Sequence, residues 1–281
     1  MKIRSFCLAS LVIFSFSLTW AYLPPAKMIL EKAIEKNGKP LASIDQEVSI
    51  HIGADVYSFR EVWLIDSDKN MKVTITGLNE LKDKLMIQYL YTGQKKWIHE
   101  NGKEKTTQNI SNDLFERFFY VRSPDELAEY LSAYNMAPKG FFSKKNYTVT
   151  KGEFSYDAEP FVKLSRAGGG VSYLFALSNT PSSAIWFEQD RFVIRRILLP
   201  STAELAVDNY QTYEPSFHVG KSKRLSWSGY KAEMKVNSVA KRDNKALAGL
   251  QPASLEVSTP LENLRSLKGG EVLIEFFSRF R

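Results

Sequence analysis

The most constraining feature of this sequence is the stretch from Asp45 to Thr107, where apolar and polar residues alternate between turn signals. Side chains on a β-strand point to opposite faces with a period of two. The alternation therefore separates one large apolar face from a more polar one, and it predicts an antiparallel meander. Within Val56 to Ile65, the apolar parity carries Tyr57, Phe59, Trp63 and Ile65.

The rest of the chain predicts more strands of this kind, with few helices between them. Ala26 to Asn37 has helical spacing, and a capping box at Ser123 begins a second helix that runs from Pro124 to Tyr134. A third, short helix is expected after Thr259, and Glu271 to Phe280 is predicted to be the last strand. The sum is a mainly β fold of about ten or more strands with about three helices.

Residues 1–21 are predicted to be a signal peptide. Lys2 and Arg4 precede an apolar run, Phe6 to Phe16, and Thr19 and Ala21 occupy the small-residue positions of a cleavage site. The run is shorter than the ~20 residues that span a bilayer, which disfavours a retained membrane anchor. We therefore expect cleavage after Ala21 and export of residues 22–281, as one soluble domain, to the periplasm.

Residue types that carry catalysis or bind metals are scarce. The single cysteine, Cys7, falls within the predicted signal peptide, so the mature chain would lack thiols and disulfides. The three histidines, His51, His99 and His218, have no partner at metal-binding spacing, and no nucleophile elbow is present. We therefore expect no enzyme activity, no cofactor and no metal site.

The net charge of +7 bears on the kind of partner. Basic residues are dispersed in short runs such as Lys95-Lys96 and Arg195-Arg196, and dispersed pairs are usually solvated. An exported protein meets little nucleic acid, so no nucleic-acid binding is expected. Anionic membrane surfaces or acidic partners are more consistent with this charge.

Aromatic residues are the other candidate functional feature, at 13% of the sequence and concentrated on predicted strands. They are either ordinary core or the lining of an apolar cavity, because so few helices cannot cover so long a sheet. The residue pattern leaves both interpretations open. The predicted ligand-binding residues of such a cavity are Tyr57, Phe59, Trp63, Ile65, Val73, Trp97, Leu127, Leu131, Tyr134, Trp186 and Trp227.

Several segments resemble the family of the periplasmic lipoprotein carrier LolA, its outer-membrane acceptor LolB and related lipoprotein-sorting proteins. The similar features are the helix at Ala26 to Asn37 and the strand pair of Phe59 to Leu64 with Met71 to Ile75. Tyr91 to Ile98 resembles the family's glycine turn and tryptophan strand, and Lys231 to Val239 resembles a closing strand. The resemblance implies an incomplete, half-open antiparallel β-barrel capped by a few short helices, with a hydrophobic cavity for acyl chains.

The leading hypothesis is a periplasmic carrier or chaperone that shelters the acyl chains of a lipid or lipidated protein, with the helix at Pro124 to Tyr134 as a lid. The resemblance implies an inner-membrane transporter and an outer-membrane acceptor as further partners. The alternative is a non-catalytic cell-envelope scaffold with a filled core. In that alternative, an exposed edge strand at Glu271 to Phe280 pairs with a partner by strand addition.

Overall fold

The computed structural model describes residues 23–37, 40–101, 105–144, 147–150, 153–156, 159–214 and 217–281. The predicted signal peptide, with Cys7 and the cleavage site after Ala21, lies outside the described residues. No helix in the described ranges is long and apolar enough to cross a membrane.

Thirteen of the described strands form one antiparallel sheet, in the order β6-β5-β4-β3-β2-β1-β15-β14-β13-β12-β11-β10-β9. Its first half consists of β1 (Ala42–Ile52), β2 (Asp55–Ser67), β3 (Asn70–Gly77), β4 (Met86–Thr92), β5 (Lys95–Ile98) and β6 (Thr106–Asn109). Its second half consists of β9 (Val162–Ala167), β10 (Gly170–Phe175), β11 (Ala184–Glu188), β12 (Ile194–Leu198), β13 (Glu204–Glu214), β14 (Phe217–Trp227) and β15 (Tyr230–Lys241). The strands β7 (Tyr147–Thr150) and β8 (Glu153–Tyr156) pair with each other, apart from this sheet.

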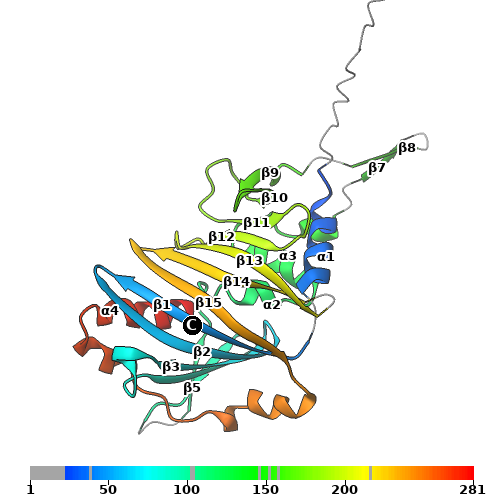
Figure 1. Ribbon diagram of the computed structural model, residues 1–281. Helices are drawn as coiled ribbons and strands as arrows, with labels where there is room; N and C mark the ends of the chain where they lie inside the picture. The colour runs from blue at the N-terminus through cyan, green and yellow to red at the C-terminus, as the bar shows by residue number, and fades with distance from the viewer. Residues whose placement is uncertain are drawn as a thin grey trace, which may run out of the picture.

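The two halves of the sheet meet in its middle, where β1 pairs with β15 and Val48 lies opposite Met234. Every other pairing in this sheet joins strands that follow one another in the sequence. In the described part of the chain, β6 and β9 form the two edges and do not pair with each other, so the sheet curves without closing (Figure 1). The predicted fold class, a half-open antiparallel barrel with a few short helices, is confirmed.

Alternating burial along the strands gives the sheet two distinct faces. On β2, Phe59, Trp63 and Ile65 lie in the main hydrophobic cluster, whereas the intervening Leu64 packs with a separate cluster that contains Leu250. The main cluster lies on the inner side of the curve, which we call the concave face. The opposite, outer side is the convex face.

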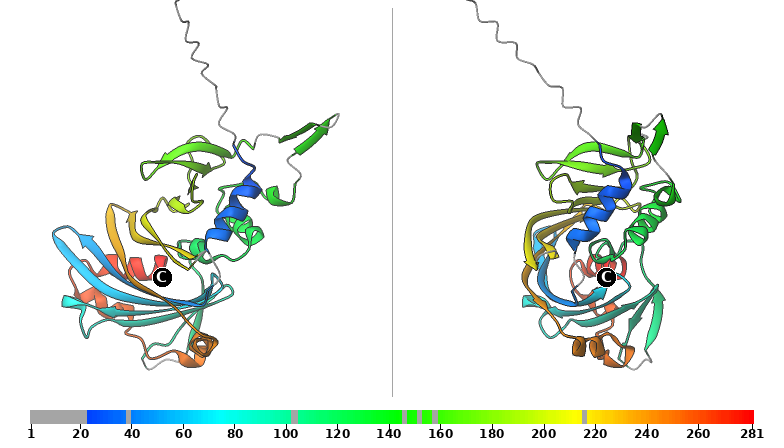
Figure 2. Two further views of the ribbon diagram at one scale, coloured as in Figure 1. Left: turned by 45° about the vertical axis from the view of Figure 1, so that its right-hand side comes forward. Right: turned by 90° about the vertical axis from the view of Figure 1, so that its right-hand side faces the viewer.

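Helices cover the two ends of the concave face. The α-helices are α1 (Ala26–Asn37), α2 (Arg117–Tyr120), α3 (Pro124–Ala133) and α4 (Gly270–Phe280), and α1 packs against α3 and β14. Figure 2 shows α4, in red, within the curve of the sheet. Short 3₁₀ helices complete the described structure: η1 (Asn79–Leu81), η2 (Phe141–Ser143), η3 (Asn244–Leu250), η4 (Pro252–Ser254) and η5 (Leu261–Ser266).

Most of these elements agree with the sequence-based predictions. The predicted helix at Ala26 to Asn37 is α1 with the same bounds, and the predicted meander from Asp45 to Thr107 corresponds to β1 through β6. The helix predicted from Pro124 is α3, although the Ser123 side chain makes no capping hydrogen bond. The short helix expected after Thr259 is the 3₁₀ helix η5.

The predicted last strand, Glu271 to Phe280, is wrong, because this segment is the helix α4. Its apolar residues alternate well enough to suit a strand, and their types favour one. A helix fits better, since two apolar residues that the strand pattern leaves out, Leu273 and Phe277, join the same helical face. The large apolar side chains buried on that face are Val272, Leu273, Phe276, Phe277 and Phe280.

Gly77, at the end of β3, lies so close to η1 that a Cβ atom there would sit 1.9 Å from the Leu81 carbonyl oxygen. The backbone must shift to make room, so we expect Gly77→Ala to lower the free energy of unfolding by about 1–3 kcal/mol. Urea denaturation measures the change. Gly170→Ala is the matched control, because the nearest heavy atom to its added Cβ is 4.0 Å away. Equal losses in the two variants would contradict the prediction.

Candidate functional site

Helix α4 covers the concave face with a row of aromatic side chains. The ring centroids of Phe276 and Phe277 lie 5.7 and 5.0 Å from that of Phe59 on β2. Trp227 of β14 contacts Phe276 at 5.8 Å and Phe280 at 5.3 Å between centroids. Tilted and edge-to-face pairs at these distances are favourable beyond the area that they bury. The helix therefore packs directly on two of the predicted lining residues, Phe59 and Trp227.

Most of the predicted lining residues meet in the main cluster behind this helix. They come from β2, β3, β14 and α3, and Tyr134 packs against them while partly buried. Their role in ligand binding stays a prediction. The members of the predicted set that are buried in the main cluster are Tyr57, Phe59, Trp63, Ile65, Val73, Leu127, Leu131 and Trp227.

Two predicted residues, Trp97 and Trp186, lie apart from this set. Trp97 pairs with Leu90 of β4, whose neighbours Tyr89 and Tyr91 point into the main cluster, so Trp97 points to the convex face. Trp186 lies in a third cluster with alanines from the region of β9 to β11. The concave face therefore carries two of the four tryptophans named in the prediction.

A buried carboxylate that was not among the predicted site residues lies on the concave face. Glu61 is 0% exposed and shares the inward parity of Phe59 and Trp63 on β2. It accepts hydrogen bonds from Gln46 Nε2 at 2.6 Å and from Trp63 Nε1 at 3.0 Å. The signal in the sequence was a charged residue at an apolar position of a strongly alternating strand.

Arg281, which follows α4, provides the counter-charge. Its Nε lies 2.6 Å from Glu61 Oε1, and both side chains are fully buried. The guanidinium carbon also lies 5.5, 5.1 and 5.0 Å from the ring centroids of Trp63, Phe115 and Phe276. A buried charge is tolerated when it is paired and hydrogen-bonded. The ion pair therefore fixes the end of α4 to β2.

A second buried cation contacts the same residue. Lys96 of β5 donates from Nζ to the main-chain oxygen of Arg281 at 2.9 Å and lies 4.5 Å from the centroid of the Tyr89 ring. Burial lowers the pKa of Lys96 to about 8, because it disfavours the charged ammonium. One residue, Arg281, thus provides partners for both an anion and a cation of the sheet.

Some polar atoms of the concave face have no hydrogen-bond partner among the described residues. They are Gln46 Oε1, Tyr91 Oη and Trp227 Nε1, and all of them are buried. Gln46 contacts Glu61, and Tyr91 stacks on Trp63 at 6.1 Å, so two of these atoms adjoin the ion pair. An unpaired buried polar group is unfavourable by about 1–3 kcal/mol. These groups of the concave face are therefore available to water or to a ligand.

A further buried ion pair holds α2 against the sheet. Lys223 Nζ of β14 lies 2.9 and 2.8 Å from the two carboxylate oxygens of Glu116, the residue before α2. The ammonium also lies 4.9 Å from the centroid of the Phe119 ring. Because each charge has its partner within the pair, we assign it a structural role.

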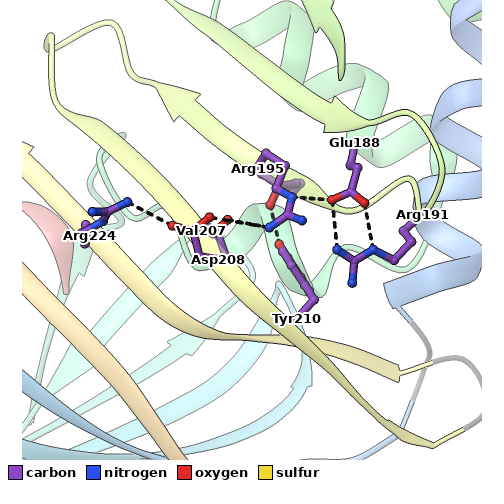
Figure 3. A network of polar contacts seen from close by, with 8 residues as sticks. Glu188, Arg191, Arg195, Val207, Asp208, Tyr210 and Arg224 are labelled. Atoms are coloured by element: carbon purple, nitrogen blue, oxygen red, sulfur yellow. Dashed lines mark hydrogen bonds and ion pairs between the residues drawn. The ribbon is translucent and has the colours of Figure 1, made fainter. Parts of the chain in front are cut away.

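Figure 3 shows a charged network across the strands β11 to β14. Glu188 pairs with Arg191 at 2.8 Å and also with Arg195, while Asp208 pairs with Arg224 at 3.0 Å. Arg195 also approaches Asp208 to 3.6 Å, which links the two halves of the network. Both carboxylates have arginine partners, so the network ties neighbouring strands together.

The concave face is the best candidate for a functional site. The described residues hold no group of three or more His, Cys, Asp or Glu side chains that could bind a metal ion. Two surface cavities, of about 570 Å³ beside α3 and about 650 Å³ beside η5, are lined by residues outside the predicted set. Apolar walls with a few charged groups, Glu61 and Lys96, suit the binding of an amphiphile.

Comparisons with known proteins bear on the fold. No family model matches the sequence, and no curated protein matches it. Among solved structures, a LolA superfamily protein from Nitrosomonas europaea is similar with a TM-score of 0.52 and 13% identity, covering 80% of this chain and 97% of that chain. The chain has a LolA-like fold. The predicted resemblance to this family is thereby confirmed at the level of the fold.

Two other solved structures are similar with lower TM-scores. A DUF1329 family protein from Desulfovibrio piger has a TM-score of 0.48 and 12% identity, covering 83% of this chain and all of that chain. A domain assigned to outer membrane lipoprotein sorting, from Vibrio parahaemolyticus, has a TM-score of 0.45 and 10% identity, covering 79% of this chain and 97% of that chain. The assignment of the fold rests on the Nitrosomonas europaea protein, and at 13% identity that likeness concerns the fold alone.

Removing Arg281 tests the buried ion pair. We expect Arg281→Met to lower the free energy of unfolding by about 3–5 kcal/mol, because Glu61 then keeps a buried charge without a counter-charge. The double variant Glu61→Gln/Arg281→Met should recover most of this loss, since it leaves neither charge. Denaturant titration measures both. The exposed Arg224→Met serves as control and should change stability by less than about 1 kcal/mol. A double variant as unstable as the single one would refute the assignment.

The lowered pKa of Lys96 makes stability depend on pH in a defined direction. Above about pH 8, the unfolded chain binds more protons at this site than the native chain. The free energy of unfolding should therefore rise with pH, by up to about 1.4 kcal/mol per unit, until unfolded tyrosines ionise near about pH 10. Urea titrations across this window measure the rise. Lys96→Met should reduce the rise to the part that Lys72 contributes, because burial lowers the pKa of Lys72 as well. The exposed Lys95→Met should retain the full rise, so identical slopes in these two variants would disprove the prediction.

Proposed function

We propose that this protein is a periplasmic carrier that binds lipids or lipidated proteins and shelters their acyl chains on the concave face. The observation that carries the proposal is the make-up of that face, where aromatic and aliphatic side chains of β2, β3 and β14 form one apolar surface. The helix α4, which lies within the curve of the sheet, covers part of this surface in place of a second sheet. Apolar concavities of this kind suit lipids and other apolar ligands.

The exchange of α4 for an acyl chain is close to balanced in free energy. Five large apolar side chains of α4 are buried, and at about 1.5–3 kcal/mol each they contribute about 8–15 kcal/mol. An acyl chain of about a dozen carbons gains about 10 kcal/mol, at about 0.8 kcal/mol for each CH₂. Because these apolar sums are similar, the exchange depends on the polar contacts of α4 and Arg281, above all on the pair of Arg281 with Glu61. Transfer to a more apolar acceptor site would release the acyl chain.

Other parts of the chain have defined places in this proposal. Helix α3 is the proposed lid, and its Leu127 and Leu131 are buried in the same cluster as the concave face. Export with cleavage after Ala21 would bring the chain to the periplasm. There it would receive a lipid or lipidated protein from an inner-membrane transporter and pass it to an outer-membrane acceptor.

The scaffold alternative loses its proposed contact. Glu271 to Phe280 was expected to be an exposed edge strand, but it is the helix α4, which offers no backbone edge for strand addition. A packed interior alone identifies no partner for a scaffold. The carrier is therefore the favoured function.

Tryptophan fluorescence tests where an acyl chain binds. Trp63 lies on the concave face and Trp97 on the convex face, so each reports on one side of the sheet. Variants that keep one of them, with Phe at Trp186, Trp227 and the other position, are titrated with a brominated fatty acid, which quenches tryptophan on contact. We expect saturable quenching of the Trp63 chain and little quenching of the Trp97 chain.

Native mass spectrometry of the purified, unmodified protein complements this measurement by detecting bound lipid directly. Quenching of both tryptophans to the same extent would show that the ligand has no preference for the concave face. Absence of quenching, together with absence of any lipid adduct, would refute the carrier function.

A further inference from the structure

The last turn of α4 and Arg281, the residue after it, fill the concave face with the groups that an amphiphilic ligand would bring, which are apolar side chains and a polar end. The apolar side chains of α4 fill the apolar part of the face, and Arg281 reaches the polar part. The Arg281 guanidinium pairs with Glu61, and its main-chain oxygen accepts from Lys96. The same residue therefore presents a cation and an oxygen acceptor to two buried, oppositely charged groups.

A ligand that replaces α4 removes both of these partners at once. Glu61 would keep only the neutral donors Gln46 and Trp63, and Lys96 would lose its hydrogen-bond acceptor. Charged groups left unpaired in an apolar site are strongly unfavourable. An acyl chain with a neutral head group would leave both charges in that state. A head group of a single charge would satisfy one of the two.

We propose that the concave site selects amphiphiles with a zwitterionic head group, whose cation pairs with Glu61 and whose anionic oxygen pairs with Lys96. This inference rests on the proposed carrier function and gives its ligand a chemical class. Glu116 and Lys223 pair with each other and do not compete for the head group. Asp113, which pairs with Arg279 of α4 at 2.9 Å, keeps the hydroxyl of Ser201 as a donor when α4 is displaced.

Neighbouring groups fit the same kind of ligand. The Trp63 ring, which lies 5.5 Å from the Arg281 guanidinium, would face an ammonium group in the same way. Gln46 Oε1 and Tyr91 Oη have no hydrogen-bond partner among the described residues, and the first accepts while the second both donates and accepts. They would complete the hydrogen bonds of a head group that carries both N–H donors and oxygen acceptors.

The experiment compares three single-chain amphiphiles of equal chain length, below their micellar concentrations, on the full mature chain. They are a zwitterionic lysophosphatidylethanolamine, an anionic lysophosphatidylglycerol and a cationic alkyltrimethylammonium, each titrated by calorimetry. We expect the zwitterion to bind about tenfold more tightly than either of the others. Glu61→Gln should lower the affinity for the zwitterionic and the cationic amphiphile and leave the affinity for the anionic one unchanged. Lys96→Met should lower the affinity for the zwitterionic and the anionic amphiphile and leave the affinity for the cationic one unchanged.

Two control variants remove the same kind of charge from exposed residues outside the site. Lys95→Met changes the exposed neighbour of Lys96 on the same strand, and Glu47→Gln changes an exposed carboxylate on β1. Both should leave the three affinities unchanged. Where Glu61→Gln alone does not fold, Glu61→Gln/Arg281→Met takes its place, because it removes both members of the ion pair.

Each outcome decides the inference. The inference is supported if the two variants change the head-group preference as stated, because a general loss of folding would lower the affinity for all three amphiphiles alike. Equal binding of the three by the unmodified chain, or a uniform loss in both variants, overturns the head-group selection while the carrier function stands. Failure of all three to bind overturns the inference and the carrier function together.

Discussion

The concave face of a single curved sheet is the constraint on which the rest of this structure depends. Inward side chains from both halves of the sheet meet there as one apolar surface, and exposure of such a surface to water is unfavourable by about 25 cal/mol for each Å². Because β6 and β9 do not meet, the sheet cannot bury this surface by closing on itself. The positions of α1, α3 and α4 follow from the need to cover it.

Within that apolar surface, the pair of Glu61 and Arg281 is not explained by stability alone. Exchanging a buried ion pair for apolar residues of similar volume is often neutral or stabilising. Glu116 and Lys223 form another buried pair, but neither of its members belongs to α4 or its end, so it stays closed when α4 is displaced, whereas the pair of Glu61 and Arg281 opens. Under the proposed function, α4 therefore satisfies a charge that a ligand would otherwise meet.

Local patterns in the sequence account for what could be predicted. The alternation around Trp63 and the helical spacing of α1 depend only on residues that are close in the sequence. The meander and the first helix were therefore predicted well. Glu271 to Phe280 fits both a strand and a helix, and only packing against Phe59 and Trp227 decides between them. Which face Trp97 occupies depends on its register with β4, which the sequence alone does not give. The partner of Glu61 lies 220 residues away, beyond the reach of any local pattern.

The pairing of β1 with β15 has a consequence for the order of folding. Each half of the sheet is a run of local hairpins, whereas the seam between the halves joins strands far apart in the sequence and forms slowly. Helix α4 packs on Phe59 of one half and on Trp227 of the other, so the surface that receives it is complete only after this seam has formed. The helix that fills the concave face is therefore among the last elements to pack, whichever end of the chain folds first.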